Sequence, residues 1–381
     1  MIMAGMKFME DVPFKDVYLT SIVRDGQGRK MSKSLGNSAD PLEVIDKYGA
    51  DALRFTINYI APLGQDVLFD VDKCDIGRNF ANKIWNAARF LLMNAQELEL
   101  SEELKNKHIN FADKWIISRF QNAIKDMQKA LDNFEINSAS KIVYSFVWND
   151  FCDWYIELIK NQIYSDDKEV KAAVLSRALF LFEDMLKMIH PFMPFISEEI
   201  WQLLDERKEG ETIMKTSFPV FDELLINKTA EEEIEFVQNV VTAIRNIRGE
   251  MNIPPSKQIN VFIKTKSLSD NQIKCISSLA KVAELKADEN LTKPKASASS
   301  VVKGADIFVP LEGLIDLSVE RNRLEKEIAR LEGSLAGVNK KLSNEKFVSN
   351  APMNVIENEK TKKADWESSL QKLKSILEDL K

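Results

Sequence analysis

The chain has 381 residues, of which 45% are hydrophobic and 29% charged, and its formal net charge is −7. This length suffices for about two to four domains, and the apolar fraction excludes a chain that is disordered throughout. The negative charge argues against a surface coated with cations, although it permits local basic patches. No apolar run is long enough to cross a membrane, and the N-terminal apolar stretch is too short for a secretory signal. We expect a cytoplasmic protein without a membrane partner.

The residues that most often bind metals are few and scattered. Three cysteines, Cys74, Cys152 and Cys275, and two histidines, His108 and His190, lie far apart in the chain. Zinc sites bring such ligands together in closely spaced pairs, and no such pair is present in the sequence. We therefore expect no metal site and no protein-bound zinc, and we interpret the cysteines as buried free thiols.

The N-terminal part combines short apolar runs with a glycine-rich basic turn. The stretch Val17–Val23 is rich in β-branched and aromatic residues, which predicts a strand. Further on, Asp40 and Pro41 form a helix-start signal, and Gly49 is placed to end that helix. A second short helix is predicted from Asp51 to Ile60.

Between Asp72 and about Glu250 the apolar residues recur at helical spacing, as Phe80, Ile84 and Leu91 illustrate. This pattern predicts a helix bundle. Tryptophans recur on the same apolar faces, Trp85 among them, and we interpret them as core residues. The predicted helices include residues 139–164, 171–190, 194–206 and 230–248.

A different pattern follows the prolines near residue 254. Residues 259–263 alternate as a strand, and a helix is predicted near residues 270–285. Two further strand-like stretches lie at residues 299–303 and 306–311. We interpret this part as a small α+β module.

Beyond Asp316 the apolar residues follow heptad spacing in two segments. The residues between them, from Ser343 to Pro352, include helix breakers. An antiparallel coiled coil is therefore predicted, with arms about 40 Å long at ~1.5 Å per residue. The predicted domains are residues 1–71, 72–251, 252–315 and 316–381.

The stretch Gly28–Asn37 concentrates three cations, two hydroxyls and two glycines just before the capped helix. Lysines supply mobile charges for phosphate oxygens, hydroxyls and backbone N–H groups add donors, and glycines permit close approach. Such a loop suits polyphosphate. Two lysines in a surface loop are common, however, so the spacing by itself does not establish a site.

The complete string Lys30-Met31-Ser32-Lys33-Ser34 matches the KMSKS signature of class I aminoacyl-tRNA synthetases, and the flanking residues resemble that family too. The resemblance implies that these five residues bind ATP, which the family uses with Mg²⁺. It implies that Lys33 is catalytic: the loop closes over ATP, and this lysine stabilises the charge that develops on the leaving pyrophosphate.

Other stretches resemble valyl-tRNA synthetases in particular. Residues 82–90, 151–157, 190–196 and 244–257 are similar to their anticodon-binding region, and residues 342–352 resemble the hinge of their coiled coil. Many isoleucyl enzymes instead end in a zinc module, which three scattered cysteines cannot build. The resemblance implies a mainly α fold with four parts. These are the KMSKS-loop remnant of the catalytic nucleotide fold, a helix-bundle anticodon-binding domain, a small α+β module and a C-terminal antiparallel coiled coil.

The sequence departs from the family in one respect. The second signature of class I enzymes, a His-x-Gly-His-type sequence, fits the context of neither His108 nor His190, and no stretch resembles the editing domain or the amino acid pocket. We therefore expect a part of a valine–tRNA ligase, which joins valine to tRNA(Val) through valyl-adenylate. The chain alone should be inactive and monomeric.

Three alternatives stay open at this point. The chain could be a free-standing tRNA- or RNA-binding protein derived from a synthetase, in which the signature loop has no function. It could be the corresponding part of an isoleucyl- or leucyl-tRNA synthetase. It could also be an assembly scaffold, although the intact signature from Lys30 to Ser34 argues against that interpretation.

Candidate tRNA contacts follow from clustered cations. Arg245 and Arg248 share a helix face beside a Pro-Pro turn and suit phosphate or anticodon contact, while helix capping or pairing with carboxylates is the alternative. In valyl enzymes the terminal hairpin reaches the outer corner of the tRNA, which implies phosphate contacts from basic residues on both arms. The candidates on the arms are Arg321, Arg323, Lys326, Arg330, Lys360, Lys362 and Lys363.

Overall fold

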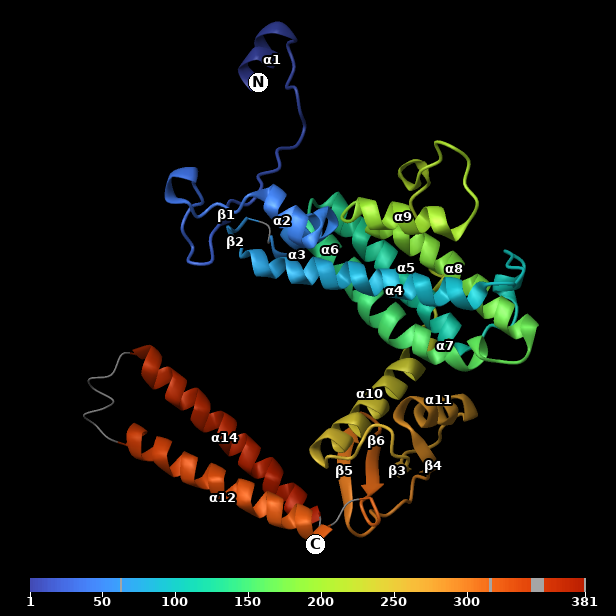
Figure 1. The fold of residues 1–381 in the computed structure, drawn as a ribbon, viewed down its shortest axis with the longest axis vertical. Helices are drawn as coiled ribbons and strands as arrows, with labels where there is room; N and C mark the ends of the chain where they lie inside the picture. The colour runs from blue at the N-terminus through green and yellow to red at the C-terminus, as the bar shows by residue number, and fades with distance from the viewer. Residues whose placement is uncertain (62–63, 315–316, 344–352, 380–381) are drawn as a thin grey trace. The chain divides into compact units, whose positions relative to one another are not determined.

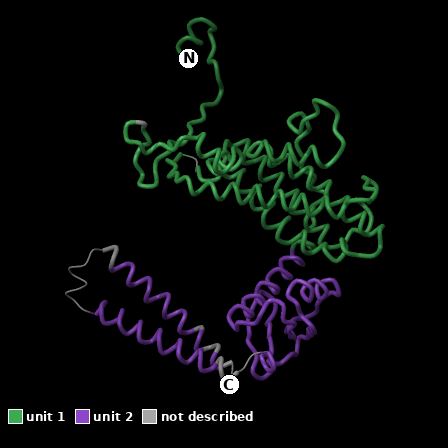
Figure 2. The backbone as a smooth tube through the Cα atoms, viewed as in Figure 1, with its two compact units in different colours: residues 1–231 green, residues 232–381 purple. Residues whose placement is uncertain are grey.

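The computed structural model describes residues 1–61, 64–314, 317–343 and 353–379. The chain divides into two compact units, residues 1–231 and 232–381 (Figure 2). The boundary falls within helix α10 (Lys228–Glu250). Helices dominate, as the apolar spacing predicts, and no described helix is both long and apolar enough to cross a membrane.

Unit 1 begins with helix α1 (Ile2–Phe8) and a very small parallel sheet. Strand β1 (Val23–Arg24) pairs with β2 (Val67–Leu68). The strand predicted for Val17–Val23 is therefore wrong over most of its length, because only its last residue belongs to β1. A strand needs a hydrogen-bonding partner along its backbone, and β2 offers β1 only two residues.

Two short helices, α2 (Pro41–Tyr48) and α3 (Ala50–Ile60), follow as predicted. The side chain of Asp40 accepts a hydrogen bond of 2.9 Å from the backbone N–H of Leu42, which caps α2 at its N-terminus. Gly49 ends α2 with a φ of 91°, in the region that favours glycine. These local signals explain why the start and the end of α2 could be read from the sequence.

The predicted helix bundle is confirmed in unit 1 (Figure 1). The predicted segment 139–164 is helical without a break up to Ile163, but its middle is a π-helix, five of whose side chains are buried. Trp85 is 41% exposed, so its interpretation as a core residue is wrong, whereas Trp115 and Trp201 are buried. The bundle comprises α4 (Asp75–Ala95), α5 (Phe111–Asp132), α6 (Ile136–Ser145), the π-helix η4 (Phe146–Tyr155), α7 (Ile156–Ile163), α8 (Lys168–Ile189), α9 (Pro194–Leu204) and the start of α10.

Helix α3 is held tightly against this bundle. The carboxylate of Asp51, in its first turn, accepts backbone hydrogen bonds from Phe195 at 3.2 Å and Ile196 at 2.7 Å, at the start of α9. Gly77 of α4 lies against Ala52 of α3 so closely that an added Cβ would stand 2.3 Å from the Ala52 carbonyl oxygen. The segment that carries the signature loop is thus fixed to a rigid support.

Unit 2 contains a four-stranded sheet in the order β4-β3-β6-β5 (Figure 1). Strands β3 (Ile259–Lys264) and β4 (Val282–Ala287) are parallel and connected by helix α11 (Asp270–Ala280). Strands β5 (Ser297–Val302) and β6 (Ala305–Pro310) form an antiparallel pair. The small α+β arrangement is as expected.

The helix predicted for residues 270–285 is wrong beyond Ala280. Lys281 takes a left-handed conformation, with φ 53°, and ends α11. Strand β4 starts at the next residue and pairs with β3. Pairing with a distant strand overrides the local helical spacing here.

Two long helices, α12 (Leu317–Leu342) and α14 (Met353–Asp379), complete unit 2. They run antiparallel, since Lys341 pairs with Glu359 at 3.3 Å and Glu332 pairs with Lys374 at 2.7 Å. We call this pair the two-helix arm. The predicted hinge lies largely in residues 344–352, outside the described residues, and the coiled-coil geometry of the arm stays a prediction.

Candidate functional site

The basic glycine-rich loop lies directly between β1 and α2. Asp25 follows β1, and its backbone N–H donates to the carbonyl of Arg29 at 3.0 Å, which closes a tight turn. Gly28 has φ 79° inside that turn, a conformation that side chains disfavour. A single β-bridge between Arg24 and Lys30 then brings the chain back beside the sheet.

The carboxylate of Asp25 lies at the centre of the loop and is largely buried. It accepts backbone hydrogen bonds from Gln27 at 3.0 Å and Arg29 at 2.8 Å, and the Arg29 guanidinium donates to it at 2.7 Å. The Asn37 amide adds a fourth donor at 3.0 Å. These donors hold the pKa of Asp25 well below its ordinary value, with the Asn37 hydrogen bond as the largest cause. The turn is therefore built around a carboxylate that stays ionised.

Asn37 binds the first part of the signature string. Its amide nitrogen donates to Asp25 and to the Lys30 carbonyl, at 3.0 and 3.3 Å. Its amide oxygen accepts from the Ser32 backbone N–H at 3.0 Å. One side chain thus fixes the backbone on both sides of Met31.

The signature residues themselves divide into an anchored half and an exposed half. Met31 is half-buried and packs against a core cluster that includes Val44 and Tyr48. Residues 33–35 form a single 3-10 turn, in which the hydroxyls of Ser32 and Ser34 lie 3.2 Å apart. Lys30 and Ser34 are exposed, and the backbone of Lys33 is described but its side chain is not.

This arrangement can bind an anionic ligand. The exposed ammonium group of Lys30, two neighbouring hydroxyls and the backbone of a short turn are donors that phosphate oxygens accept. Asp25 and Asn37, which organise the loop, were missed as site residues by the sequence reasoning. The available signals were the Asp25-Gly26 pair, typical of a turn, and an amide residue directly after Gly36.

The two arginines nominated for tRNA contact bind backbone carbonyls within unit 2. Arg248 is only 6% exposed and donates to the carbonyls of Pro254, Ala280 and Lys281, at 3.1, 2.9 and 3.0 Å. Arg245 donates to the carbonyl of Leu279 at 3.1 Å. Both guanidinium groups therefore cap the C-terminal end of α11, and the burial of Arg248 speaks against its nomination as a phosphate contact.

The cations nominated on the two-helix arm differ in their surroundings. Arg330, Lys362 and Lys363 pair with Glu327, Glu359 and Glu367 of their own helices. Arg321 and Arg323 have partners as well. Lys326 and Lys360 are exposed and form no ion pair with any residue that the structure describes.

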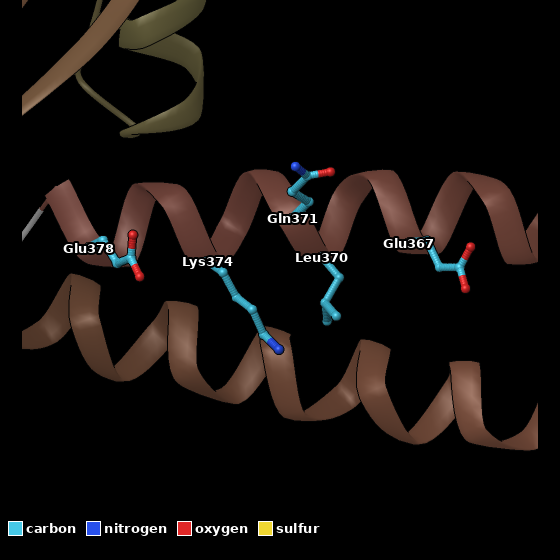
Figure 3. A pocket seen from close by; sticks show the side chains of 5 residues that line it. All are labelled: Glu367, Leu370, Gln371, Lys374 and Glu378. Carbon is cyan, nitrogen blue, oxygen red and sulfur yellow. The ribbon is translucent and has the colours of Figure 1, made fainter.

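Figure 3 shows a shallow pocket along α14 of the arm. Leu370 and Lys374 point toward the neighbouring helix, while Gln371 points away from it. The ammonium group of Lys374 forms an ion pair with the carboxylate of Glu332 on α12, at 2.7 Å. The pocket is therefore part of the helix pairing and offers no cluster of groups for chemistry.

Comparison with known proteins gives three family matches in chain order. Residues 1–70 match a model described as "tRNA synthetases class I (I, L, M and V)". Residues 113–263 match "Anticodon-binding domain of tRNA ligase", and residues 316–381 match "Valyl tRNA synthetase tRNA binding arm". The loop and these matches together define the chain as part of a class I aminoacyl-tRNA synthetase.

Individual relatives narrow this class. The chain is 42% identical to a valine–tRNA ligase of Syntrophotalea carbinolica and 44% identical to one of Chlorobaculum tepidum, each over 100% of this chain. It spans only 43% and 44% of their lengths. A leucyl-tRNA synthetase structure from Agrobacterium radiobacter, in a complex with tRNA, has a TM-score of 0.46 and 23% identity, and covers 59% of this chain and 26% of its own.

The chain belongs to the valine–tRNA ligase family. The whole-chain identity and the match of residues 316–381 to the valyl arm disfavour the isoleucyl and leucyl alternatives.

Proposed function

We propose that this chain supplies the ATP loop and the tRNA-binding regions of a valine–tRNA ligase, which attaches valine to tRNA(Val) through valyl-adenylate. The observation that carries the proposal is the organised signature loop, in a chain similar over its whole length to ligases of this name. These relatives are more than twice as long, and we expect no valine activation from residues 1–381 alone.

The loop would meet the phosphates of ATP, with Mg²⁺ bound to them. Lys30, Ser32 and Ser34 present an ammonium group and two hydroxyls at the exposed side of the loop, a donor set that fits polyphosphate oxygens. The valine carboxylate attacks the α-phosphorus of ATP, so that a carboxylate–phosphorus bond forms and the bond to pyrophosphate breaks. The loop residues hold and orient the phosphates while pyrophosphate leaves.

Lys33 is the residue we propose as catalytic. Its backbone lies in the 3-10 turn directly after the anchored residues. An ammonium group that reaches the leaving pyrophosphate stabilises negative charge that develops only in the transition state.

The remaining parts would bind tRNA(Val). We propose residues 72–251 as the anticodon-binding domain, residues 252–315 as a small module attached to it, and residues 316–381 as a coiled-coil arm on the tRNA backbone. The family descriptions of the matching segments support tRNA as the partner. On the arm, Lys326 and Lys360 are the best candidates, because they have no carboxylate partner among the described residues. We propose that the protein acts in the cytoplasm as a monomer.

The test is Lys33→Ala in a valine–tRNA ligase that contains this sequence. Loss of one preorganised charge should slow valine-dependent ATP–pyrophosphate exchange by about 10²–10³-fold. The dissociation constant for tRNA should stay nearly unchanged, because the charge serves the leaving group. Lys7→Ala removes an exposed lysine outside the loop and is the matched control. Near-normal exchange by Lys33→Ala would remove this lysine from the catalytic role.

A further inference from the structure

We propose that Asn37 and Asp25 form a latch that positions the loop for the activation step. The latch holds the backbone of residues 30–32 in place and leaves residues 34–36 exposed to meet the phosphates. This inference rests on the proposed function. Both residues act through the loop and are positioning residues.

The first support is the way one amide spans the anchored half of the loop. Asn37 binds the carbonyl of Lys30 and the N–H of Ser32 with opposite ends of its amide group, at 3.3 and 3.0 Å. A planar amide that makes both bonds fixes the peptide groups on either side of Met31. Movement of either peptide group would cost at least one of these hydrogen bonds.

The second support is the buried anchor beneath the amide. The Asp25 carboxylate accepts a hydrogen bond from the Asn37 amide nitrogen at 3.0 Å. It also accepts hydrogen bonds from two backbone N–H groups and from the Arg29 guanidinium. Asp25 follows β1, which pairs with β2, so the latch is tied to the sheet. A satisfied and ionised carboxylate gives the amide one orientation, because only its nitrogen end can donate to it.

The third support is the contrast with the residues between the two fixed points. Met31 packs on the core cluster and Asn37 is latched, whereas residues 34–36 are exposed. Gly36 has φ 63°, and a Cβ there would meet no atom within 4 Å. The exposed turn is therefore fixed at both ends, while its own residues are open to solvent. Such a turn can adjust around a ligand without moving the residues on either side of it.

The experiment compares Asn37→Ala and Asn37→Asp with Ser38→Ala, an exposed neighbouring residue that serves as the matched control. Asn37→Ala removes all three hydrogen bonds. Asn37→Asp keeps an acceptor for Ser32 but loses the donor and sets a second carboxylate against Asp25. The double variant Asp25→Asn with Asn37→Asp exchanges amide and carboxylate and restores a donor between the two positions.

The first measurement uses this chain as it stands, with trypsin, which cleaves after Arg29, Lys30 and Lys33. Loop cleavage in both single variants should be about tenfold faster or more, while the melting temperature stays close to that of Ser38→Ala. The exchanged double variant should regain part of the protection that Asn37→Asp loses. Equal cleavage of Asn37→Ala and Ser38→Ala would overturn the latch.

The second measurement is pyrophosphate exchange in a valine–tRNA ligase that contains this sequence. Asn37→Ala should lower kcat by about 10²-fold, as expected for a misplaced reacting group, with the KM for valine unchanged. A merely structural loss would lower the amount of active enzyme and the melting temperature together. If trypsin cleaves the loop of Asn37→Ala faster but kcat is unchanged, the positioning role is overturned. Absence of exchange by the unaltered enzyme would overturn the proposed function, and the trypsin result would still report on the latch.

Discussion

His190 and Ser197 face each other where α8 gives way to α9. The Ser197 hydroxyl donates to the Met193 carbonyl at 2.7 Å, so it accepts from Nδ1 of His190, 2.8 Å away. Burial lowers the pKa of His190, and the nearby Arg54 guanidinium lowers it further, while Glu198 and Asp51 act in the opposite direction. The structure therefore favours the neutral imidazole.

This shift predicts how stability depends on pH. As the pH falls below about 6.5, the unfolded chain binds a proton at this position before the folded chain does, so the free energy of unfolding should decrease until the lowered pKa is passed. One proton accounts for at most about 1.4 kcal/mol per pH unit. Denaturant titrations between about pH 5 and 7 measure the free energy of unfolding of the wild type and of His190→Asn. This free energy should decrease less steeply with falling pH in the variant.

The control is Ser38→Ala, which changes an exposed residue without a titratable side chain and should leave the wild-type dependence of the unfolding free energy on pH in place. If His190→Asn retains the full slope as well, the burial of His190 does not control this part of the pH dependence.

Arg248 shows at the same scale how a surface motif can have a structural role. Its spacing from Arg245 suggested a basic face for tRNA, but the folded chain places its guanidinium on the carbonyls at the end of α11. Those carbonyls have no partner within their helix and need donors. A local pattern could not reveal this role, because the two acceptor carbonyls lie 32 and 33 residues away in the sequence.

At the scale of elements, the crossing of α3 and α4 depends on the absence of a side chain at Gly77. The two backbones approach so closely that a Cβ there would lie 2.3 Å from a carbonyl oxygen and 2.7 Å from the Ala52 Cα. The Gly77 backbone N–H also donates to the Thr56 hydroxyl, at 3.2 Å in the buried interface. Helix α3 follows the signature loop and α2, so this contact contributes to the rigid support of the loop.

Gly77→Ala should therefore destabilise unit 1 by about 1–3 kcal/mol, the typical cost of overpacking a core. Gly333→Ala is the control, because Gly333 lies inside α12 and its added Cβ would meet no atom within 4 Å. That change should be neutral or stabilise α12 by up to ~1 kcal/mol, since alanine is the better helix former. Thermal unfolding, monitored by circular dichroism, compares the stability of the two variants. If Gly77→Ala is no less stable than Gly333→Ala, α3 and α4 do not cross as closely as described.

At the scale of the whole molecule, the two-helix arm should be separable from the remaining fold. Its buried apolar residues include Leu324, Leu331 and Val338 of α12, which packs along α14. Helix α14 also contacts strand β5, so the rest of unit 2 should lose some stability without the arm.

Deletion of residues 316–381 should leave the melting of unit 1 unchanged and raise the tRNA dissociation constant about tenfold or more, because phosphate contacts are lost. Melting temperature and tRNA affinity are measured on the same preparation. Collapse of unit 1 without a separable binding defect would make the arm a structural element.

A milder variant tests the same prediction without removing the arm. Lys326→Ala with Lys360→Ala should reduce the salt dependence of tRNA binding by about 0.7–0.9 per lost contact. Lys374→Ala is the matched control, because this ammonium group is already paired with Glu332. An unchanged slope in the double variant would withdraw both lysines as phosphate contacts.

Local physics explains what the sequence by itself determined. The cap at Asp40, the glycine at position 49 and the helical spacing of the bundle act within a few residues, so each could be predicted and each is observed. The string Lys30–Ser34 is also contiguous, and its family assignment needs no tertiary contact.

Only the tertiary structure decided the features that depend on distant partners. Asn37 reaches Asp25 across 12 residues, and β4 replaces the end of a predicted helix because β3 lies beside it. Val17–Val23 looked like a strand, yet only Val23 and Arg24 are paired with β2, which also donates one hydrogen bond to the Ile22 carbonyl. Hydrogen-bond partners and burial are set by the folded chain, and a sequence pattern records only one side of each contact.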